Sequence, residues 1–161
     1  MDIRAARLED AEAIRQIYNR EVSSSTATFD LVPRTLEDQI NWQQARSGAH
    51  AVIVAETDGE VVGFASLSPY RDRPAYNSTV EDSVYVRSDQ RGRRVGNALL
   101  SDLVTTAGQH GFHAVMARIV GDHEASIGLH ASLGFTEVGT ECEVGRKFGR
   151  WLDVVIMQRL L

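Results

Sequence analysis

The residues whose chemistry is easiest to interpret lie between Val84 and Asn97. A β-branched and aromatic run leads into a polar segment rich in arginine and glycine, and apolar residues then recur at helical spacing. This pattern predicts a strand, a tight loop and the beginning of a helix. Unpaired N–H groups and the helix dipole favour an anion at a helix start, so we predict a seat for the phosphate or pyrophosphate of a cofactor. The expected contacts come from Arg91, Gly92, Arg93, Arg94, Val95, Gly96 and Asn97.

The composition limits the class of protein. The chain has 161 residues, 43% of them hydrophobic, which suits one domain over residues 1–161 with a packed core. The net charge of −5 argues against nucleic acid as a partner. The local arginines suit a small polyphosphate better than a long polymer. No apolar run reaches the roughly 20 residues that span a bilayer, so no membrane partner is expected.

Cysteine and histidine usage indicates a reducing compartment and no metal centre. Cys142 is the single cysteine, and the residues after Met1 hold no apolar stretch of signal-peptide length. A cytoplasmic location is therefore expected. His50, His110 and His113 have no partners at metal-ligand spacing, so no metal is predicted.

The order of patterns predicts an α/β fold whose sheet is largely antiparallel. Asp58-Gly59 is a hairpin signal between two strands, and Thr35, with Asp38 three residues later, is typical of a helix cap. A strand, a helix and a strand between residues 80 and 120 imply one parallel crossover. Strands are predicted at 3–6, 51–55, 61–67, 79–86, 113–120, 135–138 and 151–160, helices at 8–22, 36–45, 95–109 and 124–133, and a glycine-bounded turn at 145–149.

Four further segments carry a resemblance that runs over nearly the whole chain. They are Ile17-Tyr18-Asn19, Thr79 to Val86, Ala125 to Phe135 and Val144 to Asp153. Together with the arginine- and glycine-rich loop, they resemble the GNAT superfamily of N-acetyltransferases, and within it the phosphinothricin and methionine sulfoximine acetyltransferases. The loop alone would be a weak signal, whereas four spaced segments in order are specific.

The resemblance implies the GNAT fold and acetyl-CoA as cosubstrate. That fold has a mixed, mostly antiparallel central sheet flanked by helices, with a splayed pair of central strands. Backbone N–H groups at the splay hold the thioester carbonyl, and preorganised donors of this kind contribute roughly 3 kcal/mol. Normal pairing between the strands is the alternative. Besides the loop, the residues implied in acetyl-CoA binding are Val84, Tyr85, Val86, His123 and Ser126.

Two residues are implied in proton transfer. Glu81 occupies the position of the family's general base, which takes a proton from the attacking amine directly or through water. Taken alone, such a strand carboxylate is more often solvated or paired with a cation. His130 occupies the position from which many members protonate the departing thiolate. Its alternative is a satisfied core histidine beside Leu129 and Leu133.

The resemblance also implies a small α-amino acid or analogue as the acetyl acceptor, such as phosphinothricin, methionine sulfoximine or methionine sulfone. Transfer is expected to be direct, in a ternary complex, without an acetyl-enzyme. An arginine in the loop at 69–78 suits an α-carboxylate, because its guanidinium can bind both oxygens. A homodimer with the C-terminal strands near the twofold axis is expected. The residues expected at the substrate are Phe29, Arg71, Arg73, Tyr76, Glu81 and Lys147.

Two residues depart from the family pattern. Arg94 replaces the usual middle glycine of the loop, and it is costly if that position requires a positive φ. We interpret Arg94 as lying in the first helical turn instead, where arginine is tolerated and adds charge near the phosphates. His123 replaces an asparagine that contacts the cofactor; because histidine can still donate a hydrogen bond, an altered contact is expected.

Two alternatives remain for the function. The acceptor could be another amine, such as a protein N-terminus or a polyamine, although a polyamine favours an acidic mouth and the loop with Arg71 and Arg73 is basic. The chain could also be a non-catalytic acyl-CoA-binding sensor. The presence of Glu81 and His130 argues against a sensor.

Overall fold

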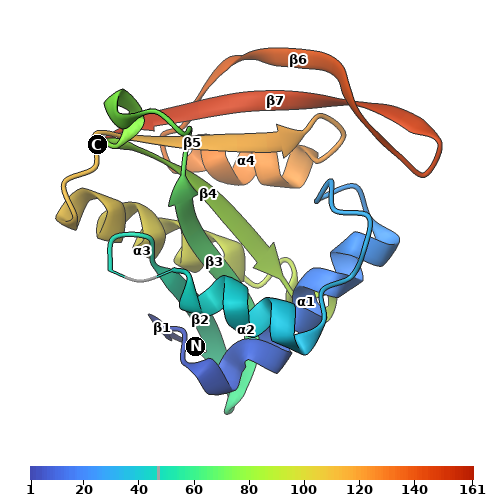
Figure 1. Cartoon of the computed structure of the whole chain (residues 1–161), viewed down its shortest axis with the longest axis vertical. Coiled ribbons are helices and arrows are strands. Elements are labelled where there is room, and N and C mark those ends of the chain that lie inside the picture. Colours follow the sequence, from blue (N-terminus) through green and yellow to red (C-terminus); the bar gives the residue numbers. More distant parts are fainter. Residues whose placement is uncertain (47) are drawn as a thin grey trace.

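A computed structural model describes residues 1–46 and 48–161 (Figure 1). In these residues one seven-stranded sheet has the strand order β1-β2-β3-β4-β5-β7-β6. The strands are β1 (Asp2–Ala5), β2 (Val52–Thr57), β3 (Glu60–Pro69), β4 (Thr79–Val86), β5 (Ala114–Val120), β6 (Thr136–Lys147) and β7 (Arg150–Leu160). The helices are α1 (Ala11–Ser24), α2 (Leu36–Gln44), α3 (Val95–Gln109) and α4 (Glu124–Ser132).

The sheet confirms the predicted mixture of strand directions. β4 and β5 are parallel and are joined through α3, while the other neighbouring pairs in the described residues are antiparallel. The hairpin between β2 and β3 turns at Asp58 and Gly59, both of which have a positive φ. The predicted cap is also present, because the Thr35 hydroxyl accepts a hydrogen bond from the Asp38 amide at 3.0 Å.

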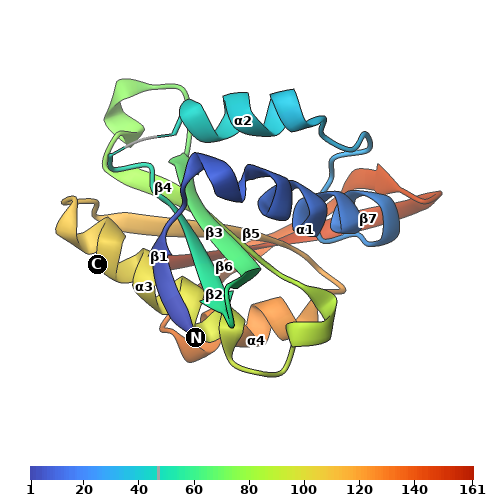
Figure 2. The same cartoon turned by 90° about the horizontal axis from the view of Figure 1, so that it is seen from below.

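The helices cover the two faces of the sheet (Figure 2). α3 packs on one face, where Leu99, Leu100 and Leu103 are fully buried. α1 packs on the other face through a cluster that includes Ile14, Tyr18 and Phe64 of β3. The face to which a strand residue points therefore decides which helical layer it meets. No helix in residues 1–46 and 48–161 is both long and apolar enough to cross a membrane.

β4 and β5 pair only over their first residues. Their register contains Thr79 with Ala114, Val80 with Val115 and Glu81 with Met116, and it ends there. β4 continues to Val86 along β3. The two central strands therefore part after Glu81, as the predicted splay requires.

The C-terminal hairpin differs from the sequence prediction. We predicted a short strand at 135–138 and a turn at 145–149, but β6 runs from Thr136 to Lys147 and only Phe148 and Gly149 form the turn. β6 is an edge strand with bulges in its register and mostly exposed side chains. Its sequence therefore lacks the apolar alternation that would have identified it.

Candidate active site

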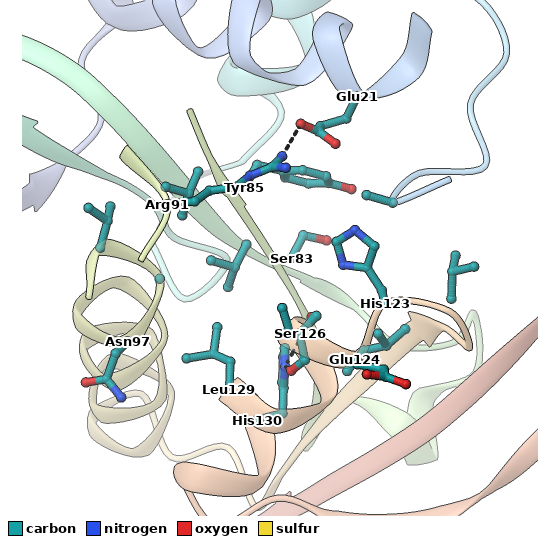
Figure 3. A pocket seen from close by; sticks show the side chains of 18 of the residues that line it. Glu21, Ser83, Tyr85, Arg91, Asn97, His123, Glu124, Ser126, Leu129 and His130 are labelled. Atoms are coloured by element: carbon teal, nitrogen blue, oxygen red, sulfur yellow. Dashed lines mark hydrogen bonds and ion pairs between the residues drawn. The ribbon is translucent and has the colours of Figure 1, made fainter. Parts of the chain in front are cut away.

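A cavity of about 720 Å³ lies where β4 and β5 part (Figure 3). Its walls are the second half of β4, the loop before α3, the first turn of α3, the end of β5 and the first turns of α4. Most of the residues predicted to bind the cofactor line this cavity, while Arg93 lies outside it. They are Val84, Tyr85, Val86, Arg91, Gly92, Arg94, Val95, Gly96, Asn97, His123 and Ser126.

The splay leaves backbone donors facing the gap between β4 and β5. The Arg87 amide donates to the Val62 carbonyl of β3 at 2.9 Å. Because N–H groups of alternate residues in a strand point the same way, the amides of Val84 and Val86 point away from β3. They face β5 beyond the last paired residue, Glu81. Two adjacent donors without a strand partner suit a carbonyl oxygen that gains negative charge.

The loop before α3 shows that our interpretation of Arg94 was wrong. Arg94 is not in the first helical turn; it is the N-cap of α3 and has φ 64°, in the left-handed region. A side chain costs roughly 1–2 kcal/mol in that conformation. The chain must reverse here between the loop and the helix axis, and that geometry requires the positive φ that a glycine would adopt without strain. Gly92, with φ 75°, meets the same requirement with a suitable residue.

Arg91 is held by a partner that the sequence did not reveal. Its guanidinium contacts Oε1 of Glu21 at 2.5 Å, as the dashed line in Figure 3 marks. Glu21 lies on α1, 70 residues away in sequence, and its side chain is only 6% exposed. Ser25 donates a hydrogen bond to its other oxygen at 2.5 Å. This carboxylate fixes Arg91 beside the loop where the phosphates are expected.

Glu81 faces the α1 side of the sheet. Its neighbour Val80 packs into the core under α3, so Glu81 points to the opposite face. Arg118 of β5 lies on that face too, because Ala117 and Ile119 point toward α3. Burial raises the pKa of Glu81 above its usual range, although the positive charges of Arg118 and Arg71 oppose the shift. Arg118 also forms an ion pair with Glu141 of β6 at 2.6 Å.

His130 lies on the other face of β4 and lines the cavity. Its Nδ1 lies 2.7 Å from the Ser126 carbonyl oxygen, and its Nε2 lies 3.2 Å from Oδ1 of Asp82. Both side chains of the Asp82–His130 pair are 3% exposed. Burial lowers the pKa of His130, but the hydrogen bond and the charge of Asp82 outweigh burial and raise it above the usual range.

His123 and Ser126 lie at the start of α4. His123 is the N-cap, and its carbonyl accepts hydrogen bonds from the amides of Ser126 and Ile127. In Figure 3 the imidazole of His123 reaches into the cavity near Ser83 of β4. The side chain of His123 therefore lines the cavity, and its contact with the cofactor stays a prediction.

None of the six residues predicted at the substrate lines this cavity. Arg71, Arg73 and Tyr76 are exposed on the loop before β4, and the ring of Tyr76 packs edge-on against Tyr70 at 5.5 Å. Arg71 is close enough to affect the pKa of Glu81.

Phe29 and Lys147 meet at the loop after α1. The Phe29 ring lies directly on the backbone of Gly145, where an added Cβ would collide with it. Lys147 is buried, and its ammonium donates to the Thr28 carbonyl at 2.8 Å. Lys147 therefore anchors the segment that presents Phe29.

Sequence reasoning missed Asp82, Arg118 and Glu21. Asp82 stands beside Glu81, so strand alternation alone puts the two carboxylates on opposite faces and could have singled it out. Arg118 occurs in an apolar strand, where a charged residue is a weak signal of a site. Glu21 gave no signal, because its contact with Arg91 depends on how α1 packs.

Comparison with known proteins identifies the class. Residues 11–135 match the acetyltransferase (GNAT) family. The L-methionine sulfoximine/L-methionine sulfone acetyltransferase of Pseudomonas paraeruginosa is 42% identical over 158 residues, covering 97% of this chain and 92% of that protein.

Two solved structures are similar over the whole fold. The ribosomal-protein-alanine N-acetyltransferase of Brucella melitensis has a TM-score of 0.98 at 40% identity and covers 100% of both chains. A phosphinothricin acetyltransferase of Sinorhizobium meliloti in complex with acetyl-CoA has a TM-score of 0.96 at 38% identity, covering 99% of this chain and 88% of that one. The chain belongs to the GNAT family and is an acetyl-CoA-dependent N-acetyltransferase.

The cavity fits that cosubstrate. Gly92 turns in the left-handed region, and no atom lies within 4 Å of where its Cβ would be, while Gly96 lets α3 pack closely against the Leu129 side chain, at 3.2 Å from where its Cβ would be. The loop before α3 thus exposes backbone of the kind that binds anions at a helix start. The amides of Val84 and Val86 lie further along the same cavity, where the pantetheine arm and the thioester are expected.

Proposed function

We propose that the protein acetylates the α-amino group of a small amino acid or analogue, of the methionine sulfoximine, methionine sulfone or phosphinothricin type, by direct transfer. The observation that carries this proposal is the position of Arg118 and Arg71 around Glu81, on the face of β4 opposite the Asp82–His130 pair. A carboxylate beside two cations suits a zwitterion whose amine must lose a proton and whose carboxylate needs a positive partner. The names of the similar proteins support this choice.

Glu81 is the proposed general base. Its carboxylate takes a proton from the substrate ammonium, directly or through one water, and leaves the amine free to attack. The raised pKa of Glu81 strengthens it as a base, because a carboxylate with a pKa nearer the working pH holds the proton better.

The amides of Val84 and Val86 are the proposed donors to the thioester oxygen as it gains charge. Removing one donor of this kind from an enzyme typically costs 10²–10³-fold in kcat. His130 is the proposed donor of the proton that the departing thiolate receives. Acetyl-CoA supplies the activated acetyl group, and the pocket residues hold it in reach of the amine.

The substrate is proposed to lie between the loop at 69–78 and the segment around Phe29. Arg71 and Arg73 supply cations for the α-carboxylate, together with Arg118, and Tyr76 lies on the same loop. Phe29 forms a wall for the side chain of the substrate. Lys147 supports that wall through the Thr28 carbonyl.

A matched set of acceptors tests this proposal. Thiol release from acetyl-CoA is measured with methionine sulfone, methionine sulfoximine, phosphinothricin, the carboxamide of methionine sulfone, spermidine and a peptide that begins with alanine. We expect strong turnover on the free acids and a loss of at least about tenfold in kcat/KM on the carboxamide, since one charged hydrogen-bonding partner is removed.

The other outcomes identify other functions. Turnover confined to the peptide would overturn the free amino acid in favour of a protein N-terminus, and turnover confined to spermidine would favour a polyamine. Acetyl-CoA binding with no turnover on any amine would overturn the proposed function in favour of a sensor.

A homodimer and a cytoplasmic location complete the proposal. Val144, Phe148 and Trp151 are each more than half exposed near the tip of the β6–β7 hairpin, which projects from the rest of the sheet (Figure 1). Exposed apolar side chains that cluster in this way favour a protein partner, and a second copy is the proposed one. Light scattering on the purified protein tests it. The exposed thiol of Cys142 suits a reducing compartment.

A further inference from the structure

Asp82 is a buried carboxylate that the mechanism above does not use. It follows Glu81 in β4, so its side chain points to the opposite face, into the α3 and α4 layer. The residue is 6% exposed and lines the cavity. A carboxylate this deeply buried is costly unless a cation or several donors compensate it.

The hydrogen bonds of His130 determine where its protons lie. A carbonyl oxygen only accepts, so the contact of 2.7 Å with Ser126 requires a proton on Nδ1. Nε2 then meets Oδ1 of Asp82 at 3.2 Å, and a second proton must lie between these two atoms for the contact to be favourable. His130 is therefore an imidazolium when Asp82 is a carboxylate.

The other oxygen of Asp82 strengthens this dependence. Oδ2 is buried, and no donor within residues 1–46 and 48–161 reaches it. Among the described residues, Nε2–H of His130 is thus the group that donates a hydrogen bond to the Asp82 carboxylate. Each member of the pair compensates the buried charge of the other.

The remaining surroundings of His130 do not replace Asp82. The Phe135 ring packs edge-on against the imidazole at 5.0 Å. Other ionisable groups line the same cavity from α1, β4, the loop before α3, β5, the loop before α4 and α4 itself, but in the described residues none of them is hydrogen-bonded to His130. They are Glu21, Tyr85, Arg91, Arg94, Arg118, Asp122, His123 and Glu124.

We propose that Asp82 is a positioning residue for acetyl transfer, holding on Nε2 of His130 the proton that the departing thiolate receives. When the amine nitrogen has bonded to the acetyl carbon, the C–S bond breaks and its electron pair passes to sulfur. Asp82 and His130 both line the cavity, so the proton shared between Nε2 and Oδ1 can pass to that sulfur; His130 is then neutral, with Nδ1–H still on Ser126. Solvent returns a proton to Nε2 as the thiol leaves, drawn by the Asp82 carboxylate.

This inference rests on the proposed function, and Asp82→Asn tests it. The amide keeps the size of the side chain and can donate to a neutral Nε2, so the contact can persist while the proton is lost. We expect kcat to fall roughly 10²-fold, with KM for acetyl-CoA within about threefold, because the pair acts on the departing thiolate and not on the bound thioester. In wild type, activity should fall as pH rises and His130 loses its proton. In Asp82→Asn, that activity should already be lost at neutral pH.

Three companion measurements separate this role from a structural one. The NMR titration of the His130 ring should give a pKa below the wild-type value in Asp82→Asn. Asp82→Glu, which keeps the charge, should recover part of the rate. The double variant Asp82→Asn/His130→Gln should be no slower than His130→Gln alone, because the two residues act as a unit. Asp102→Asn removes an exposed carboxylate from α3 and serves as the matched control.

The outcomes distinguish this inference from the function on which it rests. If wild type acetylates an amine and Asp82→Asn keeps the wild-type rate, pH profile and His130 titration, the role of Asp82 is overturned and the function stands. If wild type acetylates no amine of the panel, the function is overturned and the proton donor with it. If Asp82→Asn loses its fold, as circular dichroism would show, Asp82→Glu decides: a changed rate, pH profile and His130 titration support the role of Asp82, and wild-type values of all three overturn it.

Discussion

The two faces of β4 hold consecutive carboxylates in opposite environments. Glu81 is half-buried on the α1 side, with Arg118 and Arg71 near it and the exposed residues 71–78 just before its strand. Asp82 is buried beneath α4, where its Oδ1 lies 3.2 Å from Nε2 of His130. A single strand thus separates the place where an amine would lose a proton from the place where a thiolate would gain one.

This difference follows from the period of a β-strand. Side chains alternate between faces, so two adjacent acids cannot serve the same chemistry unless the strand bulges. The Asp82–His130 pair on one face is fixed by burial and by hydrogen bonds to backbone and side chain. The cations on the Glu81 face are exposed, and Arg118 is paired with Glu141 of the edge strand β6. We therefore expect variants on the Glu81 face to change which amine reacts and variants on the Asp82 face to change how the thiol leaves.

Glu81→Gln is the change that should affect the comparison most. Without the carboxylate, the substrate ammonium loses its base, and kcat/KM should fall by about 10²–10⁴-fold. Because burial raises the pKa of Glu81, the wild-type rate should decline on the acid side at a pH above the ordinary carboxyl range, and that decline should vanish from the residual activity. Steady-state rates from pH 5 to pH 9 measure both effects.

Glu137→Gln is the matched control for that experiment, since it removes an exposed carboxylate of β6. It should keep the wild-type pH profile. A Glu81→Gln variant with the full wild-type rate at every pH would show that the base lies elsewhere and that the two faces do not divide the chemistry.

The sequence predicted the residues that line the cavity better than the residues that surround Glu81. The strand, the glycine turn and the helix start around Arg91 to Asn97 follow from local patterns, whereas the splay and the place of His130 were expected only from the resemblance to the family. Arg118 and Glu21 take part only because β5 and α1 bring them to the cavity, so no local pattern contains them. The prediction for Arg94 was wrong for another reason. An arginine favours a helical conformation, but the turn before α3 requires a positive φ at this position.

Arg118→Gln sharpens the comparison on the substrate face. Losing this cation should raise KM for methionine sulfone by roughly tenfold, the cost of one charged hydrogen bond, and should leave KM for acetyl-CoA unchanged. The positive charge of Arg118 lowers the pKa of Glu81, so its loss should move the acid-side decline to higher pH. Equal losses on the free acid and on its carboxamide would contradict a role in binding the carboxylate.

The Asp82–His130 pair should also make the free energy of unfolding depend on pH. The folded pKa of His130 is raised, so the pair stabilises the protein fully below the unfolded histidine pKa of about 6.5, and this contribution is lost as pH rises through the folded pKa. Urea unfolding from pH 6 to pH 9 should show the free energy of unfolding falling more steeply in wild type than in Asp82→Asn. Parallel curves for the two proteins would mean that the pair carries no extra proton.

Arg94→Gly should produce the smallest effect. It tests whether the arginine at the start of α3 lowers the stability of the fold and raises the affinity for acetyl-CoA. The left-handed φ of 64° strains an arginine by roughly 1–2 kcal/mol, while the freer unfolded chain of a glycine costs about 0.4–1 kcal/mol. The variant should therefore be more stable by roughly 0–1.6 kcal/mol, at most a few degrees in Tm. It should also bind acetyl-CoA several-fold more weakly, because a cation beside the pyrophosphate is gone.

Arg93→Gly is the control that separates strain from charge. Arg93 is also an exposed arginine of the loop, but its φ is not positive and it lies outside the cavity. Its replacement should therefore destabilise the protein by about 0.5–1 kcal/mol through entropy alone and change acetyl-CoA affinity less. If both variants lost stability equally, the strain at Arg94 would be absent. If both kept full affinity for acetyl-CoA, the arginine at the start of α3 would serve the turn and not the phosphates.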